Sequence, residues 1–219
     1  MKVTPFYDTW EFLLGRTGDH QNAGAFFAWV LTLGFIAVLA AGLWIAWRNW
    51  DEDPRQHTRE HVLNWIMRTL IGCMWFQGSL WKLPLPISGG LKGWTEQLAE
   101  HAAFPIHSWI ATNIFLPGLV VINPLVFLAE FGMGIALILG FFVRPFAILG
   151  VLFTAHLWLG LYRHPGEWPW EYVFLIFVIG YFYLNNVGMS LGLDAIMARR
   201  PWGPLKGNGT IATLYRRFV

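Results

Sequence analysis

The chain has 219 residues, of which 56% are apolar, 17% are aromatic and only 13% are charged. The mean hydropathy is +0.47, and the charged share is about half of what soluble domains carry. This composition excludes an ordinary water-soluble domain and indicates an integral membrane protein. The formal net charge of +2 is too small for a nucleic-acid-binding surface. Cys73 is the single cysteine, so the chain forms no internal disulfide and no dithiol redox pair.

Five apolar runs come close to the roughly 20 residues that a helix needs to cross a bilayer. The first run is free of charge and follows a polar segment, which favours a retained span over a cleaved signal peptide. The fifth run begins after an aromatic cluster that is typical of a membrane interface. The predicted spans are residues 25–47, 62–81, 119–141, 146–161 and 172–187. We therefore expect an all-α bundle with five transmembrane helices.

The predicted organisation has three parts. Residues 1–58 form an N-terminal extension that carries the first span, residues 59–200 form a four-helix membrane domain, and residues 201–219 form a basic tail. Residues 82–118 are the long connection between the second and third spans, where apolar and polar residues interleave in a partly helical pattern. We expect this connection to lie over the membrane surface.

The distribution of Lys and Arg predicts the orientation, because short loops rich in these residues remain in the cytoplasm. With the segment after the first span placed inside, nine Lys and Arg residues fall on the inner side and five on the outer side, while Arg68 lies inside a span. This predicts an outer N-terminus and an inner C-terminus in a prokaryotic cytoplasmic membrane. Residues 82–118 are then extracytoplasmic.

Two charged residues, Arg68 and Glu130, lie inside the predicted spans. A charge in the bilayer costs roughly 2.5–3.5 kcal/mol on insertion scales, so such residues face a neighbouring helix or a cavity. His156 lies in the fourth span, which a four-residue loop joins to the third. Glu130 and His156 therefore reach similar depths on adjacent helices, where a carboxylate and an imidazole can pass protons. These three residues and Gln77 are expected to edge a cavity that binds a quinone headgroup or another small redox substrate.

Two alternatives remain open for these residues. Arg68 and Glu130 can form an ion pair that fixes helix packing, and His156 can be a satisfied histidine in a helix interface. On the outer side, Lys82 and Lys92 are candidates for attracting an anionic substrate such as an oxyanion of sulfur, although Lys82 can also extend its ammonium from the span end to water. The sequence contains no recognisable metal or flavin motif. Any electron carrier is then the substrate, the quinone or a partner.

Three segments resemble the DoxX/DoxD family of small four-helix membrane proteins. RTLIGCMWFQGSLWKL is similar to that family's first helix, and LAEFGMGIALILGFFVRP to its second. NNVGMSLGLDAIMARR resembles its closing SLD signature, with a Leu–Gly pair inserted after the serine. The residues that carry the resemblance are Arg68, Gly72, Gly78, Lys82, Glu130, Gly132, Gly134, Gly140, Arg144, Ser190, Leu193 and Asp194. It covers about residues 59–200 and implies a DoxX-like bundle, from which the first span and the long outer segment depart.

This enlargement is similar to DoxD, the large-subunit part of thiosulfate:quinone oxidoreductase. The resemblance implies a membrane subunit of a quinone-linked oxidoreductase with a partner subunit. In that mechanism Glu130 and His156 handle protons and Arg68 stabilises negative charge on a quinone oxygen, while Lys82 and Lys92 attract thiosulfate. The alternative is a non-catalytic accessory subunit that stabilises a larger membrane complex. A transporter is less favoured, because the spans show no paired inverted repeats.

Overall fold

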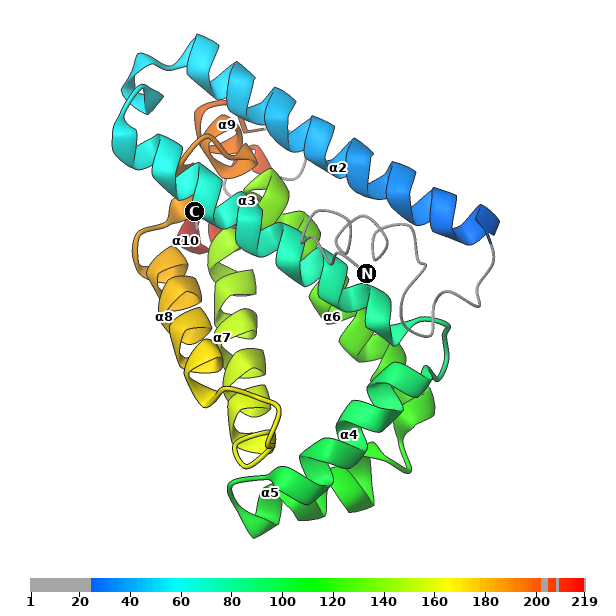
Figure 1. Ribbon diagram of the computed structural model, residues 1–219. Helices are drawn as coiled ribbons and strands as arrows, with labels where there is room; N and C mark the ends of the chain where they lie inside the picture. Colours follow the sequence, from blue (N-terminus) through cyan, green and yellow to red (C-terminus); the bar gives the residue numbers. More distant parts are fainter. Residues whose placement is uncertain (1–24, 202–204, 208, 219) are drawn as a thin grey trace, which may run out of the picture. The chain divides into compact units, whose positions relative to one another are not determined.

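The computed structural model describes residues 25–201, 205–207 and 209–218, and within these ranges the chain is all-helical with no strand. Figure 1 shows the helices in chain order. The all-α prediction is therefore confirmed. The first 24 residues, which contribute to the charge count of the outer side, lie outside the described residues.

The helical elements match most of the apolar runs of the sequence. The α-helices are α2 (Ala25–Glu52), α3 (Arg59–Ser79), α4 (Gly89–His101), α5 (Pro105–Ile110), α6 (Leu119–Leu139), α7 (Val143–Gly160), α8 (Pro169–Leu184), α9 (Leu193–Arg199) and α10 (Thr210–Phe218). The shorter turns are η2 (Pro54–Gln56), η3 (Leu80–Lys82), the π-helical η4 (Ala111–Phe115) and η5 (Val187–Met189). The long connection after Lys82 is thus largely helical.

Three of the described helices are long and apolar enough to cross a membrane: the Trp29–Glu52 part of α2, α6 and α7. They coincide with the first, third and fourth predicted spans. α8 is apolar but has only 16 residues. α3 has 21 residues, but polar side chains such as Asn64 and Arg68 lower its mean hydropathy. These three helices are consistent with the predicted integral membrane protein, while the predicted count of five spans stays a prediction.

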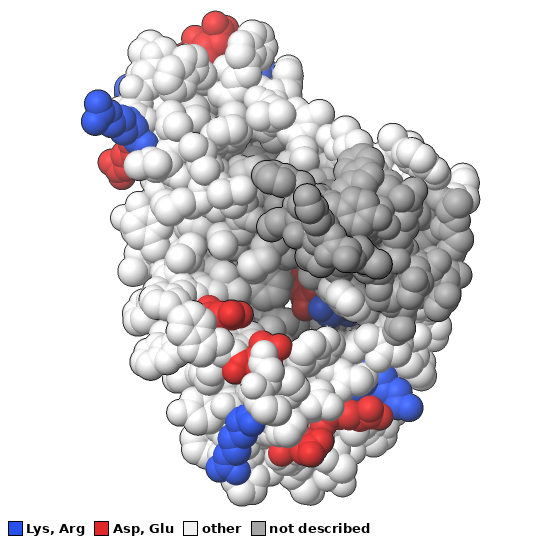
Figure 2. Space-filling model, in the orientation of Figure 1, with Lys and Arg blue, Asp and Glu red and all other residues white. Residues whose placement is uncertain are grey.

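The chain forms two compact units, each assembled from separate stretches of sequence. Among the described residues, unit 1 comprises residues 25–36, 75–132 and 153–174, and unit 2 comprises residues 37–74, 133–152, 175–201, 205–207 and 209–218. Where Figure 2 shows described residues, the surface is mostly uncharged and charged side chains stand in a few small groups. Such a surface suits a lipid environment.

Unit 1 is held together by two small apolar clusters. Leu80 and Leu83 form the first, against which Leu31, Trp81 and Phe127 pack. The second contains Leu98 of α4, Ala111 of η4 and Leu161, with Ala99, Phe115 and Tyr172 around it. The second cluster fixes α4 and η4 against the end of α7.

The start of α4 is fixed by polar contacts in unit 1. The hydroxyl of Ser88 accepts a hydrogen bond from the Leu91 main-chain nitrogen at 3.0 Å and donates to Asn123 Oδ1 at 3.1 Å. Ser88 is thus the N-cap of α4. The Asn123 amide in turn donates to the carbonyl of Lys82 at 2.9 Å. One buried network therefore holds together the end of η3, the start of α4 and α6.

In unit 2, glycines let α3 and α6 approach closely. A Cβ atom on Gly72 would lie 2.8 Å from the main-chain nitrogen of Ile138 and 3.0 Å from the carbonyl oxygen of Gly134. Small residues at such contacts are typical of helix packing in membranes. The side of α3 away from this contact exposes apolar residues. They are Leu63, Ile66, Met67, Leu70 and Met74.

Asp194, the acidic residue of the SLD-like segment, has a structural role in unit 2. Its carboxylate accepts hydrogen bonds from the main-chain nitrogens of Phe142 at 2.8 Å and Val143 at 3.2 Å. These nitrogens lie at the start of α7, where helices leave donors unpaired. The Tyr215 hydroxyl of α10 donates to the same carboxylate at 2.8 Å. Asp194 therefore joins the beginning of α7 to the C-terminal helix.

Candidate functional site

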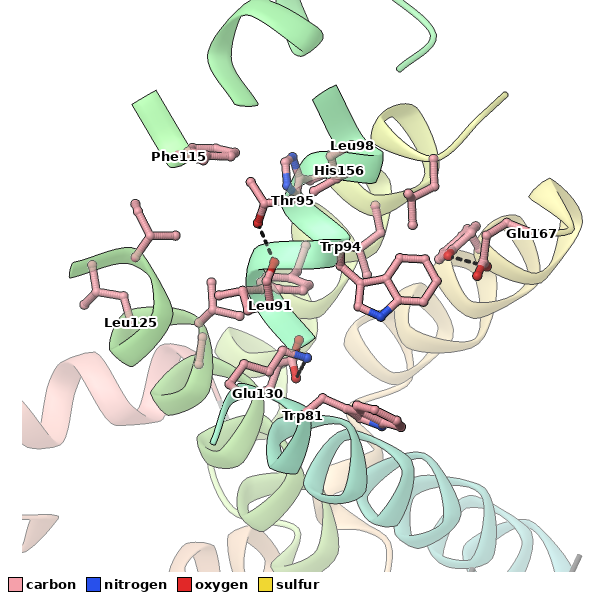
Figure 3. A pocket seen from close by; sticks show the side chains of 18 residues that line it. Trp81, Leu91, Trp94, Thr95, Leu98, Phe115, Leu125, Glu130, His156 and Glu167 are labelled. Carbon is pink, nitrogen blue, oxygen red and sulfur yellow. Dashed lines mark hydrogen bonds and ion pairs between the residues drawn. The ribbon is translucent and has the colours of Figure 1, made fainter. Parts of the chain in front are cut away.

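Unit 1 contains a cavity of about 430 Å³ between η3, α4, α6, α7 and the start of α8 (Figure 3). Its walls are mainly aliphatic and aromatic side chains, among them Trp81, Leu91, Trp94, Phe115 and Leu157. A few polar side chains interrupt them: Lys82, Thr95, Glu130, His156, Glu167 and Tyr172. This size and this mixture of many apolar and few polar groups are typical of small-molecule sites.

Lys82 and Glu130 form an ion pair in the wall of the cavity. Lys82 Nζ lies 2.7 Å from Glu130 Oε2, and the two side chains are only 14% and 4% exposed. The Lys82 ammonium also donates to the carbonyl oxygen of Gly78 at 2.9 Å. A Cβ atom on Gly78 would lie 3.6 Å from Glu130 Oε2, so this part of α3 is close to the carboxylate. The pair places a strong donor and a strong acceptor, with no net charge, in an apolar cavity.

His156 of α7 lies in another part of the wall, near Leu98 and Phe115 (Figure 3). Its ring stacks on that of His107 in α5, with centroids 4.8 Å apart and planes inclined by 18°. The Phe115 ring meets His156 edge-on at 5.5 Å. Burial lowers the pKa of His107 below its ordinary value of 6.5. The stacked pair is therefore favoured with His107 neutral.

Thr95 and the Glu167–Tyr172 pair complete the polar groups. The Thr95 hydroxyl donates to the carbonyl of Leu91, one turn earlier in α4, at 2.7 Å. The Tyr172 hydroxyl donates to Glu167 Oε2 at 2.7 Å. Figure 3 shows Glu167 beside Trp94, across the cavity from Leu125. This second carboxylate gives the cavity a polar margin on the α4 and α8 side.

The predicted site residues divide into two groups. Lys82, Glu130 and His156 line the cavity, whereas Gln77 and Lys92 are not among its lining residues within the described chain. Lys92 is exposed on α4 and lies 3.9 Å from Glu96, one turn away. The sequence analysis missed His107, Glu167 and Tyr172 as neighbours of the site. No local pattern marks them, because His107 reaches the site from α5, Glu167 from the loop before α8 and Tyr172 from the first turn of α8.

Arg68 lies in unit 2, where it is fully buried. Its guanidinium donates to the main-chain carbonyls of Leu137, Ile138 at 3.2 Å and Ser190 at 3.4 Å. The first two carbonyls belong to the last turn of α6, where the regular helical donors are missing, although the Gly140 main-chain nitrogen also donates to the Leu137 carbonyl at 3.3 Å. A cation there is also favoured by the helix dipole. The alternative prediction was an ion pair between Arg68 and Glu130. In the structure Arg68 donates to carbonyl oxygens, and Glu130 pairs with Lys82.

This arrangement favours one kind of ligand. An ammonium donates to a carbonyl oxygen, a carboxylate accepts from a hydroxyl, and the apolar walls contact the rest of the molecule. A free anion gains little here, because Glu130 already neutralises Lys82. The cavity therefore suits a neutral molecule with a compact polar head and an apolar body. Among the described residues, no three His, Cys, Asp or Glu side chains gather as a metal-binding group.

Comparison with known proteins adds no relative to this description. No protein-family model, no curated protein and no solved structure matches the chain.

Proposed function

We propose that this chain is the membrane subunit of a quinone-linked oxidoreductase and that the unit 1 cavity binds the quinone headgroup. The observation that carries the proposal is the Lys82–Glu130 pair, buried at 2.7 Å in the wall of an otherwise apolar cavity that His156 also lines. A quinone presents carbonyl oxygens on a flat apolar ring, and a quinol presents hydroxyl groups in the same places. The pair offers a hydrogen-bond partner to both forms.

In this mechanism each side chain has a defined task. Lys82 donates to a quinone oxygen and stabilises the negative charge that develops there during reduction. Glu130 and His156 are the titratable side chains that first take up protons and then pass them to the reduced ring. The electrons come from a partner subunit, where a sulfur oxyanion such as thiosulfate is the proposed donor. Arg68 takes no part, since its guanidinium is engaged with main-chain carbonyls.

The same proposal includes five transmembrane helices, the last four forming a DoxX-like bundle. For α3, the exposed apolar stripe from Leu63 to Met74 supports contact with lipid. For α8, the length of 16 residues gives about 24 Å of helix, short of the hydrocarbon core. Exposed Trp168 and Trp170 at its start suit the interface and compensate for the short length. The proposed orientation has the N-terminus outside and the C-terminus inside.

Quinone binding is tested directly with the purified protein in lipid nanodiscs. Binding of a radiolabelled analogue of ubiquinol, the reduced form whose hydroxyl groups can donate to the Glu130 carboxylate, is measured for the wild type and for Glu130→Gln, which keeps the side-chain shape but removes the charge. Losing one charged hydrogen bond of about 1.5–3 kcal/mol weakens binding roughly 10–100-fold. Glu96→Gln, an exposed acid on α4 paired with Lys92, is the matched control and binds as the wild type. Absence of quinol binding by the wild type, or equal binding by Glu130→Gln, refutes the proposal.

A second candidate function is that of a non-catalytic accessory subunit. It is favoured by α2, where Trp44, Trp47 and Trp50 are exposed on the part of the helix that belongs to unit 2. Aromatic residues are enriched at protein interfaces as well as at membrane surfaces. On this alternative, Glu130→Gln leaves the turnover of the complex unchanged and only weakens assembly, which co-purification from native membranes measures.

A further inference from the structure

Leu125 of α6 combines two properties. It lines the cavity, and yet its side chain is 57% exposed. Its neighbours on the helix have only one of these properties each. Ile122, Val126 and Ala129 line the cavity, whereas Val121 and Leu128 are exposed and do not line it. Leu125 therefore lies at the border between the cavity-lining stripe and the outer stripe of α6.

The outer stripe of α6 belongs to a helix that is long and apolar enough to cross a membrane. Val121, Leu125 and Leu128 are spaced by four and three residues, so they share one helix face. Exposed leucine and valine on a membrane-spanning helix contact lipid chains. When α6 crosses the bilayer, the exposed side of Leu125 therefore faces hydrocarbon rather than water.

The polar end of the cavity lies elsewhere. Figure 3 shows Trp94 and Glu167 on the side of the cavity opposite Leu125. Glu130 lies between these two sides, low in the view. A molecule with a polar head and a long apolar chain matches this order of groups. The head reaches the Lys82–Glu130 pair, and the chain leaves past Leu125. A cavity of about 430 Å³ encloses a headgroup and the beginning of a chain, so the remainder has to stay in lipid.

We propose that Leu125 marks a lateral portal through which the isoprenoid chain of a lipid-soluble quinone passes from the bilayer into the unit 1 cavity. This inference rests on the proposed function and specifies its substrate as a long-chain quinone taken up from the membrane. The α6 side of the portal is apolar. A charged or hydrated rim would have to lose its water each time an isoprenoid chain passed, which costs free energy.

The test compares two tryptophan variants on the same helix face. Leu125→Trp narrows the portal, whereas Leu128→Trp adds the same bulk one turn away, outside the cavity lining. Binding of long-chain ubiquinone and of a tailless ubiquinone headgroup analogue is measured in nanodiscs for both variants and the wild type. We expect Leu125→Trp to weaken long-chain binding about tenfold and headgroup binding less than about twofold. Leu128→Trp is expected to match the wild type for both ligands.

The outcomes separate the portal from the binding site itself. If Leu125→Trp binds the long-chain quinone as the wild type does, the portal is overturned but the quinone-binding proposal stands. An equal loss of affinity for the long-chain quinone and the headgroup analogue also overturns the portal. Failure of the wild type to bind either ligand overturns the proposed function and the portal with it. A second measurement uses the wild-type chain, so its result does not depend on the folding of the variants. Long-chain quinone with a photoreactive group on its first isoprenoid unit is expected to crosslink to residues 121–128, and crosslinks confined to α4 or Glu167 contradict the portal.

Discussion

Replacing Lys82 by Met removes one charge from a pair whose Nζ and Oε2 atoms lie 2.7 Å apart. At an effective dielectric constant of about 20, two unit charges at this distance attract by about 6 kcal/mol. Desolvation of both groups offsets much of this attraction, but removal of one partner leaves the other buried and uncompensated, typically at about 3–5 kcal/mol. Lys82→Met therefore lowers the free energy of unfolding by roughly 3 kcal/mol or more.

The two single substitutions should not be equivalent. Lys82→Met isolates the Glu130 carboxylate, whose side chain is 4% exposed, whereas Glu130→Gln leaves an ammonium that is 14% exposed. The ammonium also keeps its bond to the Gly78 carbonyl. We therefore expect Glu130→Gln to lower the unfolding free energy less, by about 2 kcal/mol. The double variant should lose less than the sum of the two, with a coupling of about 2 kcal/mol.

The assay is equilibrium unfolding in mixed detergent micelles, followed by far-ultraviolet circular dichroism at neutral pH. The matched control is the same cycle on Lys92 and Glu96, an exposed pair at 3.9 Å on α4, where we expect a coupling below about 0.5 kcal/mol. Additive effects of Lys82→Met and Glu130→Gln, or equal coupling in both cycles, refute the reasoning, because the buried pair would then not exist as described.

Three further predictions concern other parts of the chain. Asp194→Ala removes the acceptor for two main-chain nitrogens at the start of α7 and should lower the free energy of unfolding by about 2 kcal/mol, against about 1 kcal/mol for Tyr215→Phe. Gly140 has φ +67°, and a Cβ atom there would lie 2.6 Å from Gly192 Cα, so Gly140→Ala should lower the melting temperature sharply. Gly180→Ala in α8, where no atom lies within 4 Å of the added Cβ, should leave it unchanged or raise it. Because burial lowers the pKa of His107 from 6.5, its neutral form contributes stability above pH 6.5 that is lost as the pH falls through the lowered pKa. His107→Phe should therefore reduce the fall in melting temperature between neutral pH and about pH 5, and an unaltered pH dependence would contradict this assignment.

Helix content and membrane character follow from local properties of the chain. The length of an apolar run and the spacing of its side chains do not depend on distant residues, so the predicted runs return as α2, α6 and α7. The weaker runs show the limit of this reasoning. α3 is a full helix of 21 residues, yet the buried polar side chains of Asn64 and Arg68 lower the hydropathy that identifies a span.

The candidate site could be predicted only in part. Glu130 and His156 stood out because lipid rejects polar groups, which is a property of each residue and its helix. Their partners could not be inferred in the same way. Arg68 departs from the intuitive rule that a buried cation seeks an anion, because carbonyl oxygens at a helix end are also good acceptors and the structure uses those.

The sequence by itself therefore determined that this chain is helical, that it carries helices long and apolar enough to cross a membrane, and which polar residues would have to turn away from lipid. The tertiary structure decided what those residues meet: Lys82 for Glu130, His107 for His156 and the end of α6 for Arg68. The reason is geometric. Apolar periodicity fixes where a helix lies along the chain, but its rotation about its own axis and its choice of neighbours depend on packing against residues far away in sequence. An ion pair or a ring stack forms only when both helices have the correct rotation.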